Sequence, residues 1–306
     1  MRFLLSLQQD AKLFIYIHAL LMLFRCAFLV IYSGQLGNAG AEDVAEALWL
    51  GARISLKTTA FLVGFPFVFG TIPYALWKKW PAGGIRKILG SVAVGLMTLL
   101  FMVRIPYYEI FHQGFNIMLF NGMKDDRMAI WQTAVQQYQL WPRLFGALAL
   151  MAFFIWGLIK FLETPVYYPR HHVRILDMAA VVMVPVFAVF CRFGGAFHSD
   201  SGVPWESAAR THYTVLNEAV LDDGQAMYRA YHTHARATQR AMRSISDGEL
   251  YEAIAALGGN PDAGTPITAF ERRTTAAPLE RRPHHVVVIL GENYALWPLL
   301  PEYDCL

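Results

Sequence analysis

The chain has 306 residues, of which 56% are hydrophobic and 16% are charged, and its mean hydropathy is +0.34. Soluble domains carry roughly 25% charged residues, so this composition indicates a membrane protein. The net charge of +3 is spread along the chain without a dense basic block, which argues against nucleic-acid binding, and the three cysteines lack the spacing of a zinc site or a disulfide framework.

Five apolar segments approach the roughly 20 residues that a helix needs to cross a bilayer. They are predicted at residues 13–32, 58–77, 88–103, 144–161 and 175–191. The first is longer than the apolar part of a signal peptide and is interpreted as an uncleaved anchor. Residues 1–192 are therefore predicted to form a five-helix transmembrane domain.

The distribution of lysine and arginine predicts the orientation of these helices. Basic residues collect in the second and fourth loops, at Lys78, Lys79, Arg86, Lys87, Lys160, Arg170 and Arg174. Loops of this kind are retained on the cytoplasmic side during insertion. We therefore expect a cytoplasmic N-terminus and an extracytoplasmic C-terminal part.

Two ionisable residues fall inside the first apolar segment. His18 and Arg25 are seven residues apart and share one helix face. Ionisable residues within a membrane are candidates for function by default. They either face neighbouring helices or extend their polar ends toward the membrane surface (snorkel), or they contact a lipid headgroup or an acidic partner such as Asp177 in the fifth segment.

A polar and aromatic stretch is expected just outside the third helix, with Arg104, Tyr107 and Tyr108 followed by Glu109, His112 and Asn116. Aromatic residues at this depth usually form the interfacial belt of a membrane protein. The same stretch is also a candidate for guiding a lipid headgroup, with Arg104 pairing its phosphate.

Residues 193–283 are predicted to be an extracytoplasmic helical linker. Helical spacing of apolar residues indicates helices near residues 205–220 and 224–243. A third helix starts at Ser246, which has capping-box spacing to Glu249. A connector rich in proline, threonine and arginine completes the linker at residues 261–283.

Residues 284–306 contain a short run of β-branched and apolar residues, His285–Leu290, that is typical of a buried parallel strand. Gly291 then permits a turn, and Glu292 would lie at the carboxyl end of the strand, where sites form in open α/β sheets. A carboxylate there is suited to hold a divalent metal, although it could equally cap the next helix or pair with an arginine.

This arrangement resembles the lipoteichoic acid synthase-like group of the sulfatase/alkaline phosphatase superfamily. Besides the five helices, the linker and the Gly-Glu turn, Leu50–Leu56 resembles the group's Gly-Leu-Arg-Phe-Asp-Leu stretch, and Tyr107, Tyr108 and Phe111 resemble its paired-tyrosine segment. Ser55 stands where the group usually has Asp, and Arg104 where an acidic residue is common.

The resemblance implies that Glu292 is a metal ligand for Mn2+ or Zn2+ and that residues 284–306 begin an α/β catalytic domain. It implies a parent enzyme of the bacterial cytoplasmic (inner) membrane that moves a phosphoglycerol-type headgroup from a membrane phospholipid to an envelope glycan or lipid, through a covalent hydroxyl intermediate. His18, Arg25, Arg104, Tyr107 and Tyr108 are then the lipid-headgroup candidates. The nucleophile is expected beyond Leu306, so the 306-residue chain by itself is expected to be truncated and inactive.

Two alternatives stay open. A phosphoethanolamine transferase of the same superfamily has a similar five-helix plan, although Asn293 follows Glu292 where that group has Thr or Ser. The chain could also be a non-catalytic lipid-binding or scaffold protein of the membrane.

Overall fold

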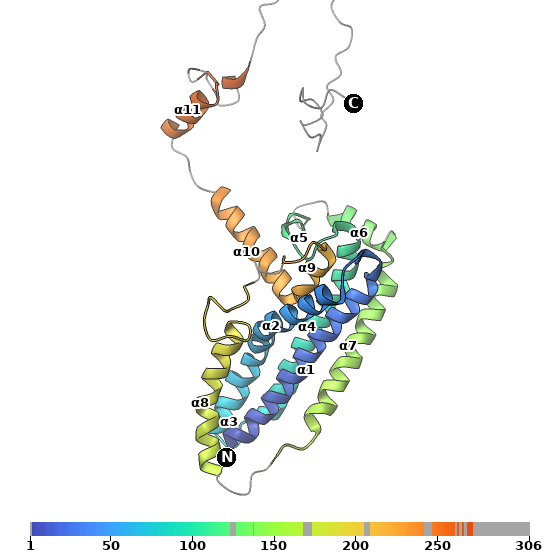
Figure 1. The fold of residues 1–306 in the computed structure, drawn as a ribbon, viewed down its shortest axis with the longest axis vertical. Helices are drawn as coiled ribbons and strands as arrows, with labels where there is room; N and C mark the ends of the chain where they lie inside the picture. The colour runs from blue at the N-terminus through green and yellow to red at the C-terminus, as the bar shows by residue number, and fades with distance from the viewer. Residues whose placement is uncertain are drawn as a thin grey trace, which may run out of the picture. The chain divides into compact units, whose positions relative to one another are not determined.

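A computed structural model describes residues 2–122, 127–136, 138–167, 173–204, 209–241, 247–260, 262, 265 and 268–271. Within these ranges every regular element is a helix (Figure 1). The chain divides into two compact units, Met1–Met242 and Arg243–Leu306. The predicted strand at His285–Leu290 and the candidate ligand Glu292 lie outside the described residues.

The first unit contains five helical spans that are long and apolar enough to cross a membrane, which confirms the five predicted segments. They lie side by side in Figure 1. One of them runs through α2, a π-helical turn η2 and α3 as a single span. The elements are α1 (Arg2–Ile31), α2 (Ala41–Pro66), η2 (Phe67–Thr71), α3 (Ile72–Leu76), α4 (Ala82–Phe111), α7 (Leu140–Glu163) and α8 (Val173–Arg192).

The helices extend beyond the predicted apolar segments, most of all in α2 and α4. The segment at residues 58–77 marks only the later part of the second span, because hydropathy detects the lipid-facing stretch and misses the polar turns before it. Asp43 accepts a hydrogen bond from the backbone N–H of Gly40 at 2.9 Å, and acidic residues in a first turn favour the positive end of a helix. The helix therefore starts at Ala41, and a short 3-10 turn η1 (Ser33–Gln35) precedes it.

The apolar core of the bundle is built around α1. Leu13, Ile17 and Phe28 are fully buried, at spacings that place them on one face of the helix. Phe24 stacks on Phe101 of α4, with ring centroids 4.4 Å apart and planes nearly parallel. This packing holds α1 against α4. It thereby also sets which way the polar side chains on these two helices point, among them Arg25 and Arg104.

Short helices gather at the end of the bundle opposite the N-terminus (Figure 1). They are α5 (Ile117–Gly122), α6 (Arg127–Gln136), α9 (Thr214–Val220) and the start of α10 (Asp223–Ala241). The apolar side chains of α9, including Val215 and Leu216, are buried. The helix predicted near residues 224–243 matches α10, whereas the one predicted near residues 205–220 is helical only from Thr214, since residues 209–213 form bends and irregular backbone. α9 packs against α1 and α2 of the bundle.

The second unit contains one helix, α11 (Asp247–Ala256), and a 3-10 turn η4 (Thr268–Phe270) in its described part. α11 matches the third predicted linker helix. It ends in a turn at Gly258, whose φ of 76° lies in the left-handed region that favours glycine.

Candidate functional site

A buried group of polar residues joins the bundle to α9 and α10. It brings together side chains from α1, α2, α4 and the start of α10 that are far apart in the sequence. We call it the docking cluster, and its members are Arg25, Ser55, Thr58, Arg104, Asp222 and Asp223.

Arg25 connects α1 to the C-terminal end of α9. Its Nε donates to the carbonyl of Ala219 at 2.8 Å, and its Nη2 donates to Ser55 Oγ at 2.8 Å and to the carbonyl of Val220 at 3.2 Å. Carbonyl groups at a helix C-terminus have no partner within the helix and carry partial negative charge. Arg25 is 3% exposed, so it satisfies these carbonyls inside the protein.

Asp222 is the N-cap of α10 and ties that helix to α2. Its carboxylate accepts from the backbone N–H of Gln225 at 3.0 Å, from Ser55 Oγ at 3.0 Å and from Thr58 Oγ1 at 2.9 Å. Gly224, two residues later, lets the first turn of α10 lie close to α2, because a Cβ at this position would lie 2.9 Å from Thr58 Cγ2. The two hydroxyl groups of α2 therefore fix where α10 begins.

Arg104 forms the ion pair of the cluster. Its Nη1 lies 3.0 Å from Asp223 Oδ1, and both side chains are 3% exposed. Its guanidinium also donates to the carbonyls of Glu218 and Leu221, at 2.6 and 3.2 Å, and stacks 4.1 Å over the ring of Phe28. Burial raises the pKa of the Asp223 carboxyl above its usual value, while the Arg104 charge beside it opposes that shift.

This geometry changes the interpretation of Arg104 and the two tyrosines. They were expected just outside the third helix, but they lie within α4 and are buried. In this structure Arg104 is buried and paired with Asp223 at the start of α10, so its guanidinium is not open to a lipid phosphate. The Tyr107 hydroxyl donates to Asn116 Oδ1 at 2.6 Å, and that of Tyr108 to Gln35 Oε1 at 3.3 Å.

The acidic partner suggested for His18 and Arg25 is also different. Asp177 accepts a hydrogen bond from the backbone N–H of Leu4 at the other end of the bundle, so the carboxylate near Arg25 is Asp222. The His18 ring stacks on Phe14 at 6.1 Å, and in the described part of the chain its buried Nδ1 has no hydrogen-bond partner.

Sequence reasoning missed Ser55, Thr58, Asp222 and Asp223 as members of this site. The available signal was Asp222, an N-cap residue directly followed by an acidic residue in the first turn of a helix. That pattern locates the start of α10 but does not reveal which bundle helices it meets.

A second buried polar group, the Asp10 cluster, lies at the end of the bundle that carries the N-terminus. Arg86 Nε pairs with Asp10 Oδ1 at 2.6 Å, and Asp10 also accepts from the hydroxyl of Thr71. Arg86 Nη2 donates to Ser6 Oγ at 2.7 Å. Arg86 was expected in a loop, but it is buried within α4 because this pairing draws it into the bundle.

The two clusters bracket the apolar part of the bundle. Arg86 and Arg104 are 18 residues apart on α4, which at about 1.5 Å per residue corresponds to about 27 Å. The hydrocarbon core of a bilayer is about 30 Å thick. The distance between the two buried clusters is therefore close to the thickness of a hydrocarbon core, and apolar side chains fill the length between them.

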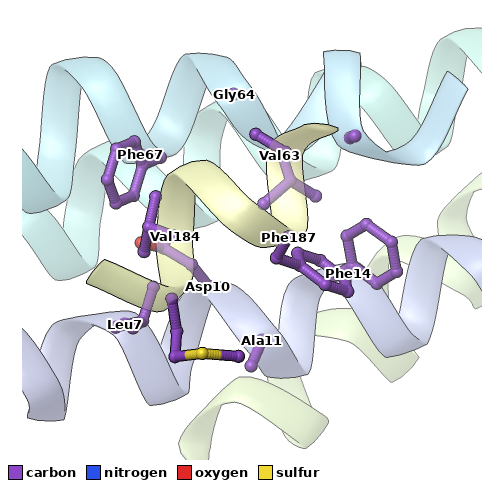
Figure 2. A pocket seen from close by; sticks show the side chains of 12 residues that line it. Leu7, Asp10, Ala11, Phe14, Val63, Gly64, Phe67, Val184 and Phe187 are labelled. Carbon is purple, nitrogen blue, oxygen red and sulfur yellow. The ribbon is translucent and has the colours of Figure 1, made fainter. Parts of the chain in front are cut away.

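An apolar groove of about 420 Å³ lies between α1, α2 and α8 (Figure 2). Its ionisable wall residue is Asp10, whose carboxylate belongs to the Asp10 cluster. The other lining residues are Leu7, Ala11, Phe14, Ala60, Val63, Gly64, Phe67, Met183, Val184, Phe187 and Ala188.

Comparison of the chain with protein-family models, curated proteins and solved structures gave no match. In the described ranges, no three His, Cys, Asp or Glu side chains gather closely enough to hold a metal ion. The hydrogen bonds and the ion pair of the docking cluster join α1, α2 and α4 to the end of α9 and the start of α10.

A pair of glycine substitutions tests the docking cluster. A Cβ at Gly51 would overlap the guanidinium of Arg25, which four hydrogen bonds hold in place, whereas a Cβ at Gly64 meets nothing within 4 Å. We expect Gly51→Ala to lower the free energy of unfolding by about 1–3 kcal/mol. Gly64→Ala should raise it by about 0.5–1 kcal/mol, because alanine is the better helix former. Unfolding of both purified variants in one detergent measures the difference, and equal shifts would contradict a fixed Arg25.

Proposed function

We propose that this chain is the membrane part of a bacterial envelope transferase of the lipoteichoic acid synthase-like group. Such an enzyme moves a phosphoglycerol-type headgroup from a membrane phospholipid to an envelope glycan or lipid. In this proposal Glu292 contributes to a site for Mn2+ or Zn2+. The five apolar helices support the membrane location.

The docking cluster is the observation that carries the proposal. It fixes the C-terminal end of α9 and the first turn of α10 to three helices of the bundle. The chain therefore leaves the bundle at a defined point and in a defined direction. A transferase that acts on a membrane lipid needs this, because its reacting groups must be held in register with the headgroup.

We place the docking cluster at the extracytoplasmic boundary. Basic residues concentrate at the opposite end of the bundle, where Lys78 and Lys79 follow α3 and Lys160 lies in the last turn of α7. The tendency of such residues to remain in the cytoplasm supports a cytoplasmic N-terminus.

Cysteine labelling tests this orientation. In a variant with Cys26, Cys191 and Cys305 replaced by serine, single cysteines are introduced at the exposed positions Asp200 and Lys78. A membrane-impermeant maleimide should label Asp200→Cys in intact cells, and should label Lys78→Cys only after the membrane is opened. The reverse pattern would place α9 and α10 in the cytoplasm and overturn the proposal.

Lipid retention tests the class of donor. The purified chain is exchanged into vesicles with equal amounts of phosphatidylglycerol, phosphatidylethanolamine and phosphatidylcholine, and the lipids that remain bound are measured by native mass spectrometry. We expect phosphatidylglycerol to be retained in preference to the other two. A preference for phosphatidylethanolamine would favour the phosphoethanolamine transferase instead, and equal retention would contradict a transferase with either donor.

A further inference from the structure

The groove between α1, α2 and α8 has a wall that offers a ligand only apolar contacts. Three aromatic residues, Phe14, Phe67 and Phe187, line it together with small and aliphatic residues (Figure 2). The one carboxylate, on Asp10, is already bound to Arg86 and Thr71. An occupant of the groove therefore has to be a hydrocarbon, since no polar group of a ligand would find a partner there.

The groove lies at the depth of the membrane interior. All three helices that form it qualify as membrane spans. Met183 and Phe187 of α8 line it and are 58% and 45% exposed, so its open side faces the surroundings of the bundle. In the membrane interior the bundle is surrounded by lipid acyl chains. Water does not occupy an apolar groove of this kind, because it would find no hydrogen-bond partners there.

We propose that this groove is a binding site for one acyl chain of a bilayer phospholipid. The lipid belongs to the leaflet at the N-terminal end of the bundle, because Leu7 and Asp10 lie beside the boundary marked by the Asp10 cluster. The chain enters between α2 and α8 and packs against Val63 and Phe14. This site does not depend on the proposed transferase activity, since it requires only the apolar wall and the membrane.

Gly64 provides a variant that closes the groove without disturbing the fold. It lines the groove, and an added Cβ meets nothing within 4 Å, so the side chain of Gly64→Leu has room to enter the space. Gly146 of α7 is a matched control, because it too is a helical glycine with nothing within 4 Å of an added Cβ and is not part of the groove wall. Neither substitution should lower the unfolding temperature, because each replaces a helical glycine by a better helix former at a position with open space.

The experiment uses vesicles of phosphatidylcholine that contain a phosphatidylcholine with a photoactivatable acyl chain. After illumination, mass spectrometry should find crosslinks at Phe14, Val63 and Met183. Gly64→Leu should reduce these crosslinks about fivefold, since the leucine occupies the space of the acyl chain. Crosslinks at Phe153, an exposed residue of α7, should stay unchanged, and Gly146→Leu should alter none of the groove crosslinks.

Two results would overturn the acyl-chain site. Groove crosslinks that persist unchanged in Gly64→Leu would show that the lipid contacts only the outer surface of the bundle. Crosslinks at Phe153 without crosslinks at Phe14 and Val63 in the unchanged chain would show that something other than a lipid chain fills the groove.

Discussion

Replacement of Arg104 by methionine should lower the free energy of unfolding by about 3–5 kcal/mol. The substitution keeps much of the apolar length of the side chain but leaves the Asp223 carboxylate, 3% exposed, without its ion pair. The carbonyls of Glu218 and Leu221 lose their donor as well. Thermal unfolding in detergent measures the loss, and hydrogen exchange should show that α9 and the first turn of α10 open before the bundle does.

Two further variants make this prediction specific. Arg143→Met breaks an ion pair with Glu109 whose side chains are 40% and 43% exposed, and it should cost about 0–1 kcal/mol. The double variant Arg104→Met with Asp223→Leu should recover part of the stability, because no buried charge is left unpaired. If Arg104→Met were no more destabilising than Arg143→Met, the docking cluster would not be what holds α9 to the bundle.

A loss of similar size is expected at the other end of the bundle when Arg86 is replaced by methionine. Asp10 would keep only its hydrogen bond from Thr71 and would remain a buried, uncompensated charge. The expected cost is again about 3–5 kcal/mol, measured by thermal unfolding. Here hydrogen exchange should increase in the first turns of α1 and α4, while α9 stays protected.

The neighbouring residue Lys87 supplies the control. Its pair with Glu163 has side chains that are 40% and 45% exposed, so Lys87→Met should change the stability by less than about 1 kcal/mol. Arg86 and Lys87 are consecutive residues of α4, so the two variants differ mainly in how deeply the substituted side chain is buried. If Arg86→Met and Lys87→Met lowered the free energy of unfolding by the same amount, the ion pair between Arg86 and Asp10 would not stabilise this end of the bundle.

The membrane helices could be predicted because their signal is local. Each apolar segment is long enough to be recognised by itself, and the start of α10 follows from a cap at Asp222. The polar turns at Ala41 and at Phe111 were missed because helices continue past the apolar stretch when caps and tertiary contacts support them.

The docking cluster could not be predicted because its signal is not local. Arg25, Ser55 and Arg104 are separated from Asp222 by more than a hundred residues, and no spacing within one helix relates them. Arg25 and Arg104 could be singled out from the sequence, because a charge in or next to an apolar segment is costly unless it is paired or has a function. Their partners were assigned to a lipid or to Asp177, whereas the fold supplies Asp223, Ser55 and the end of α9.

The docking cluster also has a consequence for biosynthesis. Arg25 and Arg104 are made and inserted long before α9 and Asp222, which at about 5–20 residues per second follow Arg25 by roughly 10–40 s. Until then both guanidinium groups are nascent charges within hydrophobic segments, each opposing insertion by about 2.5–3.5 kcal/mol near a helix centre and by less toward its ends. The arginines that later stabilise the folded chain therefore work against its entry into the bilayer, and the long apolar stretches of α1 and α4 offset that cost during translation.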